Sequence, residues 1–359
     1  MKCILVCSFF AAAVFSGAAL AADVPCTTAT AACTETVGVA GATGHTVIYR
    51  SYPLDTRNEA ITRALVVVHG LGRDADNYYR HTLAAAFLAD ALKDTVLVVP
   101  RFASNAGGAC KDTLAPGELA WHCQPRDDTW RTGGAAVDNT ITSFDIVDAL
   151  LHKLERKDVF PNLKAIVVAG HSAGGQFVSR YEMANLVHDS LPIKPTYVVA
   201  NPSSYAYLDG LRPTPSALPP GVAAGAPGYT APQGASPPPA FVPFADARNC
   251  TTYDNWPYGL KDRNGYATRV DDAQLKKQLA ARPTTYVLGE LDILPLYGFD
   301  SSCSAMAQGP TRLARGLAYA KYVEEKSGAR QATVVVPACG HNARCMFTAD
   351  GVLPLVFPK

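Results

Sequence analysis

The sequence predicts an α/β fold in which a mostly parallel β-sheet has helices on both faces. Three observations lead to this prediction. Short apolar, β-branched runs recur along the chain, segments of helical spacing separate them, and one strand-to-helix junction carries the pattern G-x-S-x-G. Strands buried on both faces have such uninterrupted apolar runs, and alternating strands and helices are typical of parallel sheets with crossover connections.

Six apolar runs are predicted to be buried strands of this sheet. They are Ala64–His69, Thr95–Pro100, Lys164–Ala169, Thr196–Ala200, Thr284–Leu288 and Ala332–Val336. Helices are expected between them, over Asp76–Leu92, over Ser143–Leu154 and directly after Ser172. In the second of these helices, Phe144, Val147 and Leu151 fall on one face, which is the spacing of an amphipathic helix.

The first 21 residues resemble a secretory signal peptide. Lys2 precedes the apolar run Cys3–Phe15, and Ala19-Leu20-Ala21 provides an A-x-A cleavage site. The apolar run is too short to span a bilayer comfortably. We therefore expect cleavage near Ala21, a secreted or periplasmic protein without a stable membrane anchor, and a single domain over residues 22–359.

The charges of the chain balance almost completely, with 32 Lys and Arg against 31 Asp and Glu. Phosphate backbones are bound by basic surfaces, so this balance argues against nucleic acid as the main partner. The composition leaves the oligomeric state open.

Eight cysteines follow the predicted signal peptide, an even number that favours disulfides in an exported protein. Proximity along the chain favours the pairs Cys26–Cys33, Cys110–Cys123 and Cys339–Cys345, which leaves Cys250–Cys303. For Cys339 and Cys345, which flank His341, the alternative to a disulfide is a metal cluster formed with that histidine. Because no further ligands lie nearby in the sequence, we expect a disulfide there and no metal site.

A proline-rich stretch interrupts the alternation of strands and helices. No charged residue occurs from Pro213 to Ala245, and ten of the 26 prolines lie between Pro213 and Pro243. Proline removes a backbone donor and excludes a regular helix or a central strand. An insertion over about residues 211–245 is therefore expected, either as a surface loop or as a lid-like rim over a pocket.

The segment Gly170-His171-Ser172-Ala173-Gly174 combines the G-x-S-x-G pattern with the context that this pattern needs. It follows a predicted strand and opens a predicted helix. A nucleophilic serine on such a sharp turn requires small residues two positions to either side. The pattern predicts Ser172 as a nucleophile and the backbone N–H of Ala173 as an oxyanion donor.

A second oxyanion donor is expected from His69-Gly70-Leu71-Gly72, at the end of an earlier strand. The backbone N–H of Leu71 is the first candidate and that of Gly72 the second. The alternative is a plain turn in which the glycines only provide conformational freedom.

A serine nucleophile needs a base, and the base needs an orienting acid. His341 is the last histidine and follows the predicted strand Ala332–Val336, whereas His45, His81, His122 and His152 precede Ser172. Asp292 and Glu290 both follow the predicted strand Thr284–Leu288. We expect His341 as the base and Asp292 as the acid, with Glu290 as its competitor.

Two other segments follow predicted strands. Trp130 is expected either to anchor a long loop or to touch substrate. The segment Asn201-Pro202-Ser203-Ser204-Tyr205 is expected to line a pocket.

Taken together, Gly170–Gly174, His69–Gly72, Asp292 and His341 resemble the α/β-hydrolase superfamily over residues from about 46 to 357. The resemblance is to serine esterases and lipases in general, because the HGGG form of one esterase branch is His-Gly-Leu-Gly here. It implies an eight-stranded, mostly parallel sheet, one catalytic domain, and cofactor-free hydrolysis through an acyl-enzyme.

The function expected from these residues is hydrolysis of a small-molecule or polymeric carboxylic ester. An amidase, a peptidase or a polymer depolymerase could use the same residues, and a non-catalytic binding protein of this fold is the alternative from another class.

Overall fold

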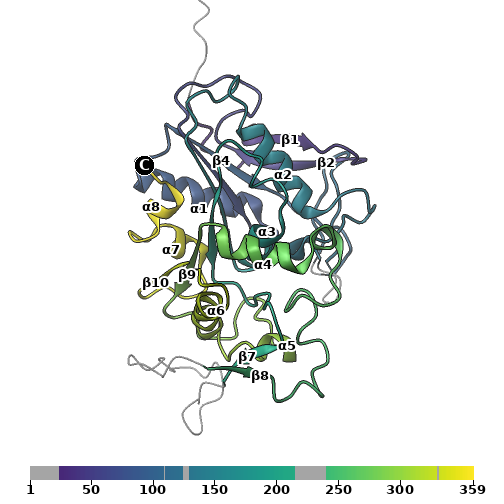
Figure 1. Ribbon diagram of the computed structural model, residues 1–359. Coiled ribbons are helices and arrows are strands. Elements are labelled where there is room, and N and C mark those ends of the chain that lie inside the picture. The colour runs from purple at the N-terminus through teal and green to yellow at the C-terminus, as the bar shows by residue number, and fades with distance from the viewer. Residues whose placement is uncertain (1–23, 109, 124–128, 215–239, 330) are drawn as a thin grey trace, which may run out of the picture.

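The computed structural model describes residues 24–108, 110–123, 129–214, 240–329 and 331–359. Its centre is an eight-stranded, mostly parallel sheet (Figure 1). The strand order is β1-β2-β4-β3-β5-β6-β9-β10. β2 is antiparallel to both β1 and β4, and the other neighbours are parallel. The strands are β1 (Thr34–Gly38), β2 (His45–Arg50), β3 (Arg63–Val68), β4 (Thr95–Pro100), β5 (Ala165–His171), β6 (Thr196–Ala200), β9 (Thr284–Gly289) and β10 (Ala332–Val336). The predicted fold class is confirmed.

The six predicted strands are all present, but the prediction that all are buried is wrong for β10, which lies at the edge of the sheet with only Val336 buried. β4, β6 and β10 have the predicted bounds. β9 is one residue longer than predicted, and β3 and β5 differ by one or two residues at both ends. The edge strand β1 and its neighbour β2 were not predicted, because most of their residues are partly or fully exposed and form no continuous apolar run.

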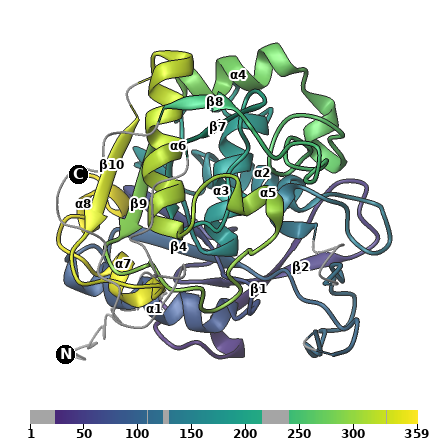
Figure 2. The ribbon, with the colours of Figure 1, turned by 90° about the horizontal axis from the view of Figure 1, so that it is seen from below.

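Helices cover both faces of the sheet (Figure 2). On one face lie α1 (Ala75–Leu88), α7 (Ala343–Phe347) and α8 (Leu353–Val356). On the other lie α2 (Ser143–Leu154), α3 (Ala173–Ala184), α4 (Asp272–Ala281) and α6 (Arg312–Ser327). Short helical turns complete the set: η1 (Ala31–Cys33), η2 (Trp130–Thr132), η3 (Gly265–Arg269) and α5 (Cys303–Met306).

Alternate residues of the central strands β3, β4, β5 and β6 pack into two different cores on the two faces of the sheet. In β3, Val66 and Val68 pack into the core that contains Phe144 of α2, whereas Leu65 and Val67 pack into the core that contains Tyr79 of α1. Each fully buried aliphatic side chain stabilises the fold by about 1.5–3 kcal/mol relative to an exposed one. Burial on both sides fixes the central strands and, with them, the loops that leave their ends.

Local signals set the helix ends. α2 begins with a capping box between Thr142 and Asp145, which satisfies backbone N–H groups of the first turn. α1 ends at Leu88, four residues earlier than predicted, because Asp90 adopts a positive φ of 50° that the helix cannot continue through.

The ends of the proline-rich stretch are described, and its middle is not. β7 (Leu211–Pro213) pairs antiparallel with β8 (Phe241–Pro243). Residues 215–239, which carry most of the expected insertion, lie outside the described residues, as does the expected signal peptide.

The four expected disulfides are confirmed as Cys26–Cys33, Cys110–Cys123, Cys250–Cys303 and Cys339–Cys345. Across the residues that the structure describes, no helix has the length and apolarity needed to cross a membrane.

Candidate active site

Parallel pairing brings the ends of five strands to one edge of the sheet. Val68 at the end of β3 pairs with Gly170 of β5, and His171 of β5 pairs with Ala200 of β6. Ala200 pairs in turn with Val287 of β9, and Gly289 with Val336 of β10. The loops that carry the predicted site residues therefore leave the sheet side by side.

Ser172 occupies the turn between β5 and α3 in a strained conformation, with φ 61° and ψ −119°. Its backbone N–H donates to the carbonyl of Ala200 at 3.0 Å, and the residue is 8% exposed. A non-glycine residue with positive φ is costly and persists only where its surroundings hold it. Here the turn raises the hydroxyl above the sheet edge.

The glycines around Ser172 are required because the backbone passes very close to its neighbours. A Cβ atom on Gly174 would lie 2.1 Å from the carbonyl oxygen of Val68, and one on Gly170 would lie 2.2 Å from that of Gly174. No side chain fits at such distances, so the turn packs directly against the end of β3.

The structure brings Ser172, His341 and Asp292 together. The Oγ atom of Ser172 lies 2.9 Å from Nε2 of His341, and Nδ1 of His341 lies 2.7 Å from Oδ2 of Asp292. The ionised carboxylate can only accept, so Nδ1 donates to it and Nε2 is left to accept from the serine hydroxyl. In this arrangement Nε2 of His341 can take the proton of the Ser172 hydroxyl.

Asp292 and its predicted competitor Glu290 occupy different places. Asp292 is 1% exposed and faces His341. The Oε2 atom of Glu290 accepts a hydrogen bond from the backbone N–H of Ala338 at 2.9 Å. Glu290 thus supports the loop that carries His341, and Asp292 contacts the imidazole itself.

The expected oxyanion donors lie at the same edge. The loop with Leu71 and Gly72 continues from β3, whose last carbonyls contact the turn at Ser172. Ala173 is the first residue of α3, so its N–H belongs to the positive end of that helix. The N–H of Ala173 directly follows Ser172 in the chain, whereas the donor role of Leu71 or Gly72 stays a prediction.

Two buried histidines support these loops. His69 donates from Nδ1 to the carbonyl of Gly70 and accepts at Nε2 from the N–H of Phe102, and burial lowers its pKa to about 4. His171 is hydrogen-bonded through Nδ1 to the hydroxyl of Tyr78 at 3.0 Å. Burial, and next the charge of His341, lowers the pKa of His171 well below its usual value. Both rings are neutral supports at neutral pH.

The segment after β6 lies beneath the site and not along a pocket wall. Asn201 accepts from the N–H of Gly289 at 2.7 Å and donates to the carbonyl of Gly340 at 3.3 Å, so it joins the loops of Asp292 and His341. Ser203, Ser204 and Tyr205 are also buried. The expectation that this segment lines a pocket is wrong.

Trp130 anchors its loop, the first of the two alternatives. It is fully buried and stacks on Phe102 with ring centroids 5.2 Å apart. Its ring also lies against His69, 4.8 Å between centroids. The tryptophan therefore holds the end of β4 and the end of β3 together.

Exposed apolar side chains border the site. Leu291, Leu296 and Tyr297 in the loop of Asp292 are 44%, 47% and 77% exposed. The same loop reaches Leu71, because a Cβ atom on Gly298 would lie 2.6 Å from the Leu71 side chain. The loop after β9 and the loop after β3 together present an apolar rim.

His341 lies inside a small covalent loop closed by Cys339–Cys345, and Asn342 caps α7 within it by accepting from the N–H of Cys345. The sulfurs at these positions are bonded to each other and not arranged as metal ligands. Among the described residues, no group of three or more His, Cys, Asp or Glu side chains is placed to hold a metal ion.

One residue at the site was not identified from the sequence. The Nη1 atom of Arg312, at the start of α6, lies 3.3 Å from Oδ1 of Asp292. No motif points to Arg312, because its helix is polar in sequence and the contact is formed only by the tertiary structure.

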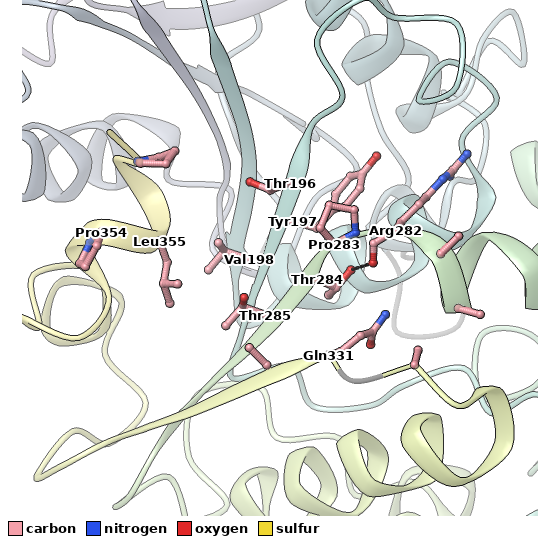
Figure 3. A pocket seen from close by; sticks show the side chains of 15 residues that line it. Thr196, Tyr197, Val198, Arg282, Pro283, Thr284, Thr285, Gln331, Pro354 and Leu355 are labelled. Carbon is pink, nitrogen blue, oxygen red and sulfur yellow. Dashed lines mark hydrogen bonds between the residues drawn. The ribbon is translucent and has the colours of Figure 1, made fainter.

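A cavity of about 450 Å³ lies elsewhere, at the opposite edge of the sheet (Figure 3). It is lined by residues at the starts of β6 and β9, including Thr196 and Thr284, and by Pro354 and Leu355 of α8. Because the site residues leave the other ends of these strands, this cavity has no part in the chemistry of Ser172.

The comparisons with known proteins agree with this fold. The sequence matches the alpha/beta hydrolase family over residues 65–353. No curated protein matches the chain. The structure is similar to poly(aspartic acid) hydrolase-1 from Sphingomonas sp. KT-1, with a TM-score of 0.57 and 21% identity over 90% of this chain and 97% of that one.

It is also similar to LpqC, a poly(3-hydroxybutyrate) depolymerase from Bordetella parapertussis, with a TM-score of 0.57 and 20% identity over 88% of this chain and 85% of that one. At these identities the two likenesses establish the fold. With the family match spanning most of its length, the chain belongs to the alpha/beta hydrolase family.

Proposed function

We propose that this protein is an exported serine hydrolase that cleaves carboxylic esters through an acyl-enzyme, with Ser172, His341 and Asp292 as its catalytic triad. The observation that carries the proposal is the pair of hydrogen bonds from Ser172 to His341 and from His341 to Asp292, 2.9 and 2.7 Å long. The strained turn at Ser172 supports it, because such strain is concentrated at functional positions.

In the first half of the reaction, the Oγ atom of Ser172 attacks the carbonyl carbon and its proton passes to Nε2 of His341. The carbonyl oxygen becomes an oxyanion, which the N–H groups of Ala173 and of Leu71, or of Gly72, would stabilise. The imidazolium then gives the proton to the leaving alcohol as the carbon–oxygen bond breaks, and Asp292 stabilises the charge on the ring.

In the second half, a water molecule attacks the acyl-enzyme. His341 takes one proton from the water, and the same oxyanion donors hold the second tetrahedral intermediate. When that intermediate collapses, the proton returns to Ser172 and the carboxylic acid leaves. No step requires a cofactor.

The ester is expected to carry an apolar acyl or aromatic group. The exposed Leu291, Leu296 and Tyr297 beside Asp292 support this, because exposed apolar clusters mark binding surfaces. Export is proposed from the signal-peptide pattern before Ala21, and the four disulfides are compatible with it.

The rival functions use the same residues on other bonds. An amidase, a peptidase or a polymer hydrolase would need the same nucleophile, and the two similar structures come from enzymes named for poly(aspartic acid) and poly(3-hydroxybutyrate). The substrate panel should therefore contain p-nitrophenyl esters of graded chain length, peptide amides, and both polymers.

The deciding experiment compares the wild type with Ser172→Ala on this panel. We expect Ser172→Ala to lower ester hydrolysis by about 10⁴-fold or more while the thermal unfolding temperature stays close to that of the wild type. Ser179→Ala is the matched control, because Ser179 is likewise a buried serine but lies within α3, about two turns beyond Ser172.

A fluorophosphonate probe distinguishes a hydrolase from a binding protein of this fold. The probe should label Ser172 in the folded wild type and should not label Ser172→Ala. A Ser172→Ala variant with near-normal turnover would refute the proposal, and a folded wild type that resists the probe would favour the binding protein.

A further inference from the structure

We propose that Arg312 is a positioning residue for this site, whose guanidinium fixes the carboxylate of Asp292 toward His341 and sets the pH at which the site becomes active. The inference rests on the proposed function, because it concerns the acid of the same triad.

Asp292 divides its two oxygens between a base and a cation. Oδ2 lies 2.7 Å from Nδ1 of His341, and Oδ1 lies 3.3 Å from Nη1 of Arg312. The side chains of Arg312 and Asp292 are 0% and 1% exposed. The carboxylate cannot rotate without breaking one contact or the other, so Arg312 limits it to the orientation that serves His341.

The guanidinium is itself held in place by three further hydrogen bonds. Its Nε donates to Oγ of Ser203 at 2.7 Å, and its Nη2 donates to the carbonyls of Leu296 and Tyr297 at 2.8 and 3.1 Å. Ser203 follows β6, whereas Leu296 and Tyr297 belong to the loop of Asp292. Arg312 thus connects two of the loops that build the site.

The start of α6 also contacts the backbone of Asp292. The N–H of Leu313 donates to the carbonyl of Asp292 at 3.3 Å. Thr311 caps this 16-residue helix by accepting from the N–H of Ala314 at 3.1 Å. The positive end of α6 and the charge of Arg312 therefore act on the carboxylate together.

Several titratable and charged groups surround this pair. Asp292 is faced by Arg312 from α6, by His341 from the loop after β10 and by Tyr205 after β6, whose pKa Asp292 helps to raise. His171, at the end of β5, packs against His341 with ring centroids 4.7 Å apart. Arg312 in turn is faced by Asp300 and Arg315.

The charge of Arg312 also acts on the buried imidazole of His171. After burial and the charge of His341, Arg312 is the next cause that lowers the pKa of His171. Burial lowers the pKa of Arg312 itself and Asp292 opposes that effect, but a guanidinium remains charged. The guanidinium lies on the side of Asp292 opposite His341, so the two groups share one carboxylate.

Arg312→Met should therefore move the acid limb of the kcat/KM–pH profile to higher pH by about one unit. Without the guanidinium, the protonated imidazole faces an uncompensated carboxylate and persists to higher pH. We also expect kcat on the plateau to fall by about tenfold or more with little change in KM, since the acid and not the substrate loses its contact.

Arg315→Met is the matched control. Arg315 lies one turn further along α6, is equally buried, and also packs on the ring of Phe299. Within the described part of the chain, its hydrogen bonds go to Ser203, Asp300, Gly309 and Met306. Arg315→Met should lower the thermal unfolding temperature and leave the acid limb in place.

The inference is overturned if Arg312→Met keeps the wild-type acid limb, or if Arg315→Met moves it equally far. If Arg312→Met does not fold, Arg312→Lys is the test variant, because it keeps the charge but not the planar donor group. Its expected result is a lower kcat with unchanged KM and an acid limb close to that of the wild type. A raised KM with unchanged kcat would contradict the positioning role.

The Ser172→Ala variant, assayed in parallel, separates the two proposals. If Ser172→Ala retains turnover, the proposed function fails and the role of Arg312 falls with it. If Ser172→Ala abolishes turnover while Arg312→Met keeps the wild-type profile, the proposed function stands and only the inference about Arg312 fails.

Discussion

Glu290 and Ala338 are joined by a hydrogen bond of 2.9 Å between the side-chain Oε2 atom and the backbone N–H group. The bond connects the loop after β9 to the loop after β10, three residues before His341. Two carboxylates only two positions apart in sequence therefore have separate tasks, one in loop support and one at the imidazole.

Replacing these two carboxylates should have very different effects on turnover. Asp292→Asn should lower kcat by about 10³- to 10⁴-fold, because an amide can stabilise the wrong tautomer of His341 and cannot stabilise the imidazolium. Glu290→Gln should stay within about threefold of the wild type, since the amide oxygen still accepts from Ala338. Steady-state kinetics on one ester check both variants. A larger loss of kcat in Glu290→Gln than in Asp292→Asn would make Glu290 the acid of the triad and Asp292 the loop support.

Removing the disulfide around His341 should affect catalysis more than removing an equally short one elsewhere. Cys339–Cys345 and Cys26–Cys33 close loops with sequence separations of 6 and 7, so loop entropy assigns each about 2 kcal/mol of stability. Cys339→Ala/Cys345→Ala should lower both the unfolding temperature and kcat, the latter about tenfold, because His341 loses its fixed loop.

The control Cys26→Ala/Cys33→Ala should lower the unfolding temperature alone. Thermal unfolding and kcat measured on both double variants decide the matter. Equal losses of kcat would mean that the loop of His341 is held by its other contacts.

The buried imidazole of His69 should link stability to pH. Burial lowers its pKa to about 4, whereas the unfolded chain titrates near 6.5. Below about pH 6.5 the unfolded chain therefore binds a proton that the folded protein excludes, and the free energy of unfolding decreases as the pH falls.

The test is the difference between the wild type and His69→Gln, because other buried groups also change their protonation on unfolding in this pH range. Burial raises the pKa of Asp148 to about 6, so Asp148 binds a proton in the folded state first. Between pH 6.5 and 5, the wild type should lose about 1.5 kcal/mol more unfolding free energy than His69→Gln. Urea unfolding at both pH values measures this, and identical losses would show that folding does not lower the pKa of His69.

The parts of the fold that the sequence predicts are those whose surroundings are uniform. β4 and β6 consist of β-branched and apolar residues that are almost entirely buried between two layers of helices, so a local run contains the necessary information. β10 carries the same kind of run, although it is an edge strand in which only Val336 is buried. β1 is the other edge strand and β2 lies beside it; most of their residues are partly or fully exposed, and their pattern does not stand out from loop sequence.

The helix α6 shows why some site residues stay hidden. Its buried face carries Arg312 and Arg315, and arginine is among the residues most often found on the surface. Ser172, His341 and Asp292 could be predicted because each follows a recognisable strand. Arg312 could not, because its role depends on a carboxylate twenty positions away that only the folded chain brings near.

Because of the close packing around Gly170 and Gly174, the position of the reactive oxygen and the choice of acyl group depend on different parts of the chain. The place of the reactive oxygen is determined by main-chain atoms pressed against Val68 and Ala200, where no side chain participates. The apolar rim of Leu71, Leu291 and Tyr297 belongs to other loops. Libraries built on these rim positions should therefore alter which acyl groups are accepted without displacing the hydroxyl that attacks them.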